Sequence, residues 1–113
     1  MNENTNYFGI DISKDVFDVY HSKLGHQSYA NDKQGFSSFL KMIPKDSLVV
    51  MEATGYYHYR FAQFLDNHKV QVSVVNPLSV KRFIQMKLAK VKTDKSDARA
   101  ICEYAQMNEV PLY

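Results

Sequence analysis

The chain has 113 residues, of which 45% are hydrophobic, and this length supports one compact domain over residues 1–113, whereas two domains would each be marginal. Its net charge is +2, its N-terminus is polar, and no apolar run approaches the roughly 20 residues of a membrane span, so we expect a cytoplasmic protein without a membrane segment. The single cysteine, Cys102, excludes an internal disulfide, and its place in an apolar helical pattern predicts a reduced thiol in the core.

Three short strands joined by tight turns open the predicted structure. Residues 6–13 alternate apolar and small or polar side chains, as expected of a strand with one buried face. Residues 15–21 and 27–31 predict a second and a third strand. The short spacing between these strands predicts two consecutive hairpins.

From there helices and strands alternate. Asn31 or Asp32 can cap an amphipathic helix that Pro44 stops, and residues 47–51 are nearly all apolar, which suits a strand buried on both faces. The remaining predicted elements are a helix after Gly55, a strand at 70–75, a helix that starts at Asn76-Pro77, and a last helix that starts at Thr93 or Asp94 and ends near Met107.

This order of elements predicts an α/β fold with a mixed five-stranded sheet and helices on both faces. The hairpins make strands one to three antiparallel, while the helical crossovers place strands four and five parallel to strand one, on its other side. The predicted strand order is therefore 3-2-1-4-5. In such sheets the sites lie near the carboxyl ends of the strands.

Four carboxylates occupy positions that are awkward for a charge: Asp11 interrupts an apolar strand, Glu52 follows another, and Asp94 and Asp97 lie three residues apart at a helix start. Burial of an ionised carboxylate is costly, so converging acids need a cation among them. A divalent metal site is the interpretation that accounts for all four. Taken alone, Asp94 and Asp97 could instead cap a helix, and Glu52 could pair with a lysine.

Positive charge is concentrated beside two of these aspartates. Residues 78–99 carry seven basic residues against two acidic ones. The basic residues are Lys81, Arg82, Lys87, Lys90, Lys92, Lys95 and Arg99. We expect the first six to bind phosphates of a nucleic acid, although a solvated helix face would look the same in sequence.

The motifs together resemble a known family. Residues 7–14 (YFGIDISK), 51–55 (MEATG), 76–77 (NP) and 92–98 (KTDKSDA) look like the N-terminal domain of insertion-sequence transposases with an Asp-Glu-Asp-Asp tetrad, the group related to the Piv DNA invertase. The resemblance implies a ribonuclease-H-like fold similar to that of the RuvC Holliday-junction resolvase. It also implies that Asp11, Glu52, Asp94 and Asp97 bind Mg²⁺ or Mn²⁺ and serve DNA cleavage and strand transfer.

Members of that family act as homo-oligomers, carry a C-terminal domain with a nucleophilic serine, and in some cases use a structured guide RNA. This sequence stops at Tyr113, so we expect that second domain to be absent and full recombination by this chain alone to fail. The sequence leaves three alternatives open. They are a Holliday-junction resolvase-like nuclease, a non-catalytic nucleic-acid-binding module, and a fragment of an actin-like sugar kinase or ATPase.

Overall fold

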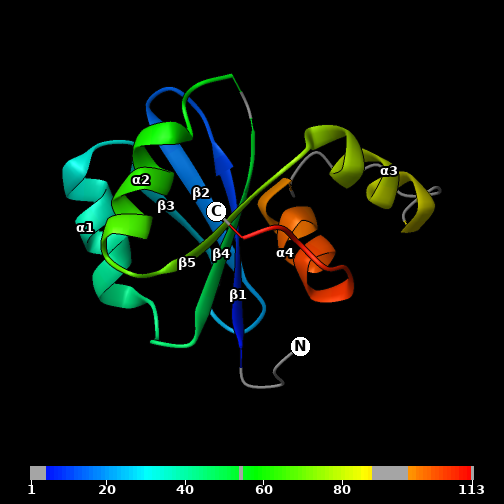
Figure 1. The fold of residues 1–113 in the computed structure, drawn as a ribbon, viewed down its shortest axis with the longest axis horizontal. Helices are drawn as coiled ribbons and strands as arrows, with labels where there is room; N and C mark the ends of the chain where they lie inside the picture. The colour runs from blue at the N-terminus through cyan, green and yellow to red at the C-terminus, as the bar shows by residue number, and fades with distance from the viewer. Residues whose placement is uncertain (1–4, 54, 88–96, 113) are drawn as a thin grey trace.

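The computed structural model describes residues 5–53, 55–87 and 97–112. In this part of the chain, five strands and four helices follow one another in the order that the amino-acid sequence predicted (Figure 1). The elements are β1 (Asn6–Ile12), β2 (Val16–His21), β3 (Gly25–Ala30), α1 (Lys33–Met42), β4 (Ser47–Glu52), α2 (Tyr59–Asn67), β5 (Gln71–Val75), α3 (Pro77–Lys87) and α4 (Asp97–Met107).

The five strands form one mixed sheet with β1 at its centre. β1 pairs antiparallel with β2 and parallel with β4. On the outer sides, β3 pairs antiparallel with β2, and β5 pairs parallel with β4. The strand order β3-β2-β1-β4-β5 confirms the order and the directions that the sequence predicted.

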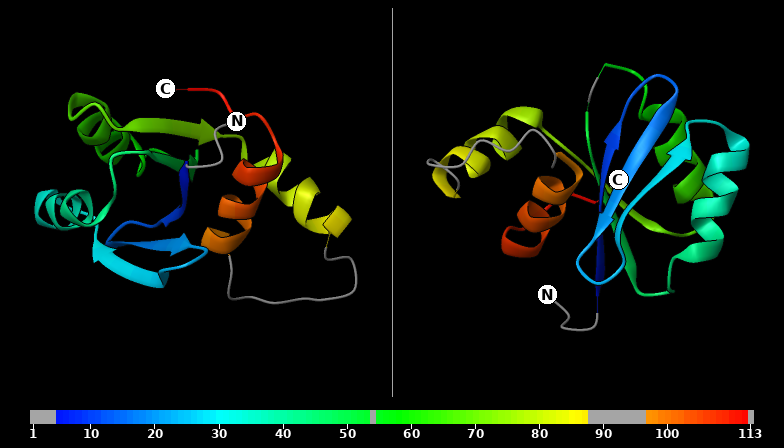
Figure 2. Two further views of the ribbon diagram at one scale, coloured as in Figure 1. Left: turned by 90° about the horizontal axis from the view of Figure 1, so that it is seen from below. Right: turned by 180° about the vertical axis from the view of Figure 1, so that it is seen from behind.

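Helices cover both faces of this sheet, so each face has its own core. α1 and α2 pack on one face, where Phe36, Phe39 and Phe61 meet the apolar side chains of the strands. α3 and α4 lie on the opposite face, where Val80 and Ile101 are buried against the sheet. The view from behind shows the same division into two helical layers (Figure 2).

In the second hairpin, between β2 and β3, the start of the strand differs from the prediction by two residues. β3 begins at Gly25 and not at residue 27, because Gly25 adopts a positive φ of 76° that closes the turn and lets it pair with His21. The ring of His21 holds this turn, since its Nδ1 accepts hydrogen bonds from the backbone N–H groups of Lys23 and Leu24.

The predicted helix caps can be checked directly. Asp32 and not Asn31 caps α1, and its Oδ1 accepts a hydrogen bond of 2.8 Å from the N–H of Gly35. Asn76 caps α3 as predicted, through a bond of 2.8 Å from the N–H of Leu78. The predicted start of the last helix, at Thr93 or Asp94, lies outside the described residues. Within them, α4 begins at Asp97.

The backbone of α4 lies directly against β1 at Gly9. A Cβ atom at residue 9 would come within 2.0 Å of the carbonyl oxygen of Ala98 and within 2.5 Å of the backbone nitrogen of Cys102. Only a residue without a side chain allows this approach.

No helix in the described parts of the chain combines the length and apolarity that a membrane span requires.

This contact predicts that Gly9→Ala destabilises the domain. The added methyl group meets backbone atoms that cannot rotate away, so we expect a loss of about 1–3 kcal/mol in the free energy of unfolding, measured by urea denaturation. Cys102→Ala serves as the matched test of the cause. Because the obstructing atoms belong to the backbone, it should not rescue Gly9→Ala, and a rescue would show that the thiol causes the clash.

Candidate metal centre and nucleic-acid interface

The alternation of β1 places Asp11 on the α4 face of the sheet. Phe8, Ile10 and Ile12 are buried in the core beneath α1 and α2. Successive side chains of a strand point to opposite faces, so Gly9 and Asp11 share the other face. Gly9 touches α4, which confirms this assignment, and Asp11 is partly exposed at the carboxyl end of the strand.

Glu52 reaches the same edge from the neighbouring parallel strand. Ile10 of β1 and Met51 of β4 are register partners, so Asp11 and Glu52, which follow them, lie side by side at a strand separation of about 4.8 Å. Met51 belongs to the core beneath α1 and α2, which leaves Glu52 on the α4 face with Asp11. The structure thus brings together two of the four carboxylates that the sequence predicted to converge.

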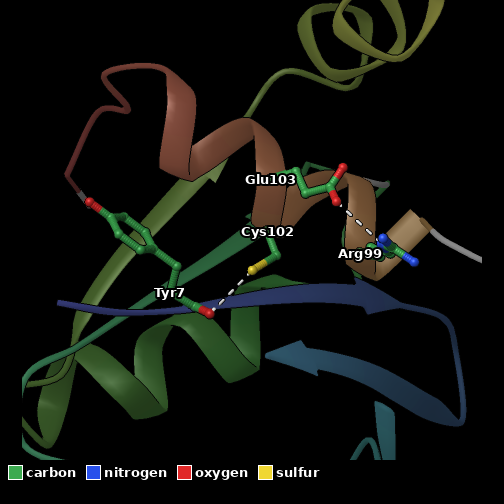
Figure 3. A network of polar contacts seen from close by, with 4 residues as sticks. All are labelled: Tyr7, Arg99, Cys102 and Glu103. Atoms are coloured by element: carbon green, nitrogen blue, oxygen red, sulfur yellow. Dashed lines mark hydrogen bonds and ion pairs between the residues drawn. The ribbon is translucent and has the colours of Figure 1, made fainter. Parts of the chain in front are cut away.

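α4 runs over β1 with its first residue toward Asp11. The carbonyl of Ala98 lies over Gly9, and the thiol of Cys102 donates a hydrogen bond of 3.3 Å to the carbonyl of Tyr7 (Figure 3). The helix therefore proceeds away from the Asp11 end of the strand as its residue numbers rise. Asp97 is the first residue of this helix.

The predicted tetrad is only partly described. Asp94 and the side chain of Asp97 lie outside the described residues. Within the described side chains, no three of the metal-binding types come together. Asp11 and Glu52 offer carboxylate oxygens, which are the ligands that Mg²⁺ and Mn²⁺ prefer, so the donor chemistry fits a hard divalent cation.

Cys102 has no part in this chemistry. It is a buried free cysteine, as the sequence predicted. Burial raises the pKa of its thiol to about 11, chiefly by desolvation. Because the thiolate is the reactive form of cysteine, this side chain acts as a core residue and not as a nucleophile or a metal ligand.

Asp18 reaches the same face and is not among the carboxylates predicted from the sequence. It lies directly opposite Asp11 in the β1–β2 hairpin, and its Oδ1 accepts a hydrogen bond of 2.5 Å from the hydroxyl of Ser28. Directly opposed residues of an antiparallel pair share a face, so two carboxylates are neighbours across the strands. The sequence did hold a signal for this, because a two-residue turn at Lys14 and Asp15 sets Asp11 opposite Asp18.

The predicted basic surface is described only at its beginning. Lys81 and Arg82 are exposed on α3, and the backbone of Lys87 ends this helix. Lys90, Lys92 and Lys95 lie outside the described residues. Arg99, the remaining cation of the segment, forms an ion pair of 3.2 Å with Glu103 on α4 (Figure 3) and lies over the ring of Tyr20.

A cavity of about 400 Å³ connects Glu52 with the basic helix. Its walls come from the end of β4 and from the inner side of α3. The lining residues are Glu52, Pro77, Val80, Lys81, Ile84 and Gln85. One predicted site carboxylate and one predicted phosphate-binding lysine thus share a single hollow.

Comparisons with known proteins find similar sequences. The family model of DEDD transposases of the IS110 type, described as "Transposase", matches residues 8–111. The pilin gene-inverting proteins of Moraxella bovis and Moraxella lacunata are each 31% identical over 116 residues, which covers 95% of this chain and 36% of theirs. The chain therefore spans about a third of the length of these relatives.

Solved structures identify the fold. Two structures of RuvC from Thermus thermophilus match with TM-scores of 0.56 and 0.60 at 14% identity. They cover 97% and 96% of this chain and 100% of theirs, and the first is a complex with a Holliday junction substrate. At this identity the likeness shows the fold alone, and it confirms the predicted ribonuclease-H-like architecture.

The opposed aspartates predict that Asp18→Asn stabilises the domain when no divalent metal is added. The change removes a like-charge contact with Asp11 but keeps an oxygen that can accept the Ser28 hydrogen bond, so we expect a gain of about 0.2–1 kcal/mol in urea denaturation at neutral pH. Asp15→Asn, at the adjacent turn, is the matched control and should change stability less. A loss of stability in Asp18→Asn would contradict the repulsion.

Proposed function

The chain belongs to the transposase family with the Asp-Glu-Asp-Asp motif, and on this premise we propose that it is the metal-dependent domain that cleaves and joins DNA strands in transposition or site-specific recombination. One observation carries the proposal. Asp11 and Glu52 lie side by side at the carboxyl ends of two parallel strands, and α4 starts over the same end of β1. Such an edge is where sheets of this kind carry their chemistry.

The site residues have defined parts in this proposal. Asp11 and Glu52, with Asp94 and Asp97, would hold Mg²⁺ or Mn²⁺. Cations held by such carboxylates supply Lewis acidity that activates a nucleophile and stabilises the leaving oxygen of a phosphodiester. Since Asp11 and Glu52 sit on paired strands with buried neighbours, their backbones are positioned before any substrate arrives.

The basic segment would bind the nucleic acid. Lys81 and Arg82 are exposed on α3, next to the edge that carries Glu52, and would contact phosphates together with Lys87, Lys90, Lys92 and Lys95. Phosphate contacts give affinity without reading sequence, so this surface would accept DNA and also a structured guide RNA.

The whole protein's assembly belongs to the same proposal. Strand exchange involves more than one DNA end, which favours a homo-oligomer, and the relatives' remaining length would complete the activity. We place the reaction in the cytoplasm because the substrate is DNA and the relatives come from Moraxella.

Metal binding tests the carboxylate assignment. Mn²⁺ should raise the melting temperature of the wild-type domain, because a ligand that binds only the folded state stabilises it, by about 1.4 kcal/mol at ten times the dissociation constant. Asp11→Asn should lose this shift, whereas Asp46→Asn, an exposed aspartate before β4, should keep it. An equal shift in wild type and Asp11→Asn would remove the metal centre from the proposal.

Salt dependence tests the DNA-binding surface. The double variant Lys81→Gln/Arg82→Gln should bind duplex DNA more weakly and with a log–log salt slope reduced by about 1.8, since each phosphate contact contributes about 0.9. The matched control is Lys41→Gln/Lys45→Gln, which removes the same charge at exposed positions near the end of α1. Fluorescence anisotropy over a salt series gives both slopes. If the α3 variant keeps the wild-type slope, the nucleic acid enters elsewhere.

A further inference from the structure

The cavity beside Glu52 has the composition of a site for a small ligand. Its volume of about 400 Å³ falls within the range of about 300–1,000 Å³ that such sites occupy. The wall from α3 is apolar at Val80 and Ile84, of which Val80 is almost wholly buried. Lys81 and Gln85, which follow each of these on the helix, add one cation and one amide.

The position of the cavity follows from the ends of β4 and β5. Glu52 and Val75 are register partners on these strands, and α3 begins two residues after Val75. The first turn of α3 therefore lies beside the Glu52 end of the sheet. Its N-terminus carries the positive end of the helix dipole, which favours an anion there and adds to the charge of Lys81.

Each part of a nucleotide has a counterpart in this wall. An aromatic base or a sugar ring can lie on the apolar side chains of Val80 and Ile84. The ammonium group of Lys81 can bind a phosphate oxygen, and the amide of Gln85 can both donate to and accept from a base edge. Glu52 lines the same cavity and lies at the edge of the sheet where the cleavage chemistry is proposed.

We propose that this cavity seats the nucleoside next to the scissile phosphate, with Lys81 binding an adjacent phosphate of the same strand. The inference rests on the proposed function, because that function places a DNA strand at Glu52. The seat takes one nucleotide out of the base stack and so orients the strand across the carboxylates. It recognises the shape common to nucleotides and not a sequence.

Size alone does not mark this site. A larger cavity, of about 490 Å³, lies between α1 and α2 and is lined in part by Lys33, Phe36 and Arg60. That cavity lies on the opposite face of the sheet and includes none of the four predicted carboxylates. Of these two cavities, the one beside Glu52 joins an apolar wall, a cation and a site carboxylate.

A titration followed by NMR tests directly whether the cavity beside Glu52 binds a nucleotide. The ¹⁵N-labelled domain is titrated, without divalent metal, with deoxyadenosine 5′-monophosphate and separately with 2-deoxyribose 5-phosphate, which lacks the base. We expect the nucleotide to shift the amide signals of Val80, Lys81 and Ile84, and to bind about ten-fold more tightly than the sugar phosphate. Shifts confined to other residues, or equal affinity for both compounds, would overturn the proposal.

Two matched pairs of variants separate the contributions. Lys81→Gln should weaken nucleotide binding by about five-fold or more, whereas Lys41→Gln, with the same charge change on α1, should not. Ile84→Ala should weaken the nucleotide more than the sugar phosphate, whereas Leu78→Ala, an exposed leucine of the same helix outside the cavity, should affect neither. The amide spectrum of each variant reports whether it is folded. Wild-type affinity in folded Lys81→Gln would overturn the proposal.

The outcome is distinguishable from a failure of the proposed function. If Mn²⁺ and DNA bind as expected but the nucleotide does not bind in the cavity, the inference about the cavity is wrong and the metal-dependent function stands. If the nucleotide binds in the cavity while Mn²⁺ binding does not depend on Asp11, the seat stands and the metal centre is wrong.

Discussion

The contact between the backbone of α4 and Gly9 is the constraint on which the site depends. Gly9 lies two residues before Asp11, and it lets the carbonyl of Ala98 reach the strand. Because the helix is held at this point, its first residue, Asp97, lies toward the Asp11 end of β1. A side chain at residue 9 would push α4 outward and separate the two segments that carry the predicted tetrad.

The mixed sheet provides the second half of this arrangement. β1 and β4 are parallel, so their carboxyl ends meet at one edge, and Asp11 and Glu52 follow directly after the paired residues Ile10 and Met51. The antiparallel hairpin on the other side of β1 adds Asp18 to the same face. Negative charge thus accumulates at β1, which pairs antiparallel with β2 and parallel with β4. The apolar residues of the same strands are buried on the opposite face of the sheet.

α3 links this negative edge to a positive surface. Its capped first turn lies beside the end of β4, and its inner side chains close a hollow that includes Glu52. The same helix presents Lys81 and Arg82 to solvent. A polyanionic strand attracted by the cations would therefore arrive next to the carboxylates, and a cation among them would offset the repulsion between phosphate and carboxylate.

Much of this could be predicted from the sequence, because local rules decide it. The period of apolar residues, the caps at Asp32 and Asn76, and the lengths of the connections determined the elements and the strand order, and the motifs around Asp11 and Glu52 determined the family. The start of β3 was predicted two residues late, at residue 27, since a positive φ leaves little trace in a hydrophobic pattern.

Other features were decided only by tertiary packing. The close approach at Gly9 and the hollow beneath α3 each depend on segments that are distant in sequence. Local propensity is insensitive to such contacts, because they arise when helices and strands dock and not when they form. The sequence by itself therefore determined the order of the elements, the fold and the family, and it named the residues proposed for the chemistry, whereas the tertiary structure decided which surfaces lie beside those residues.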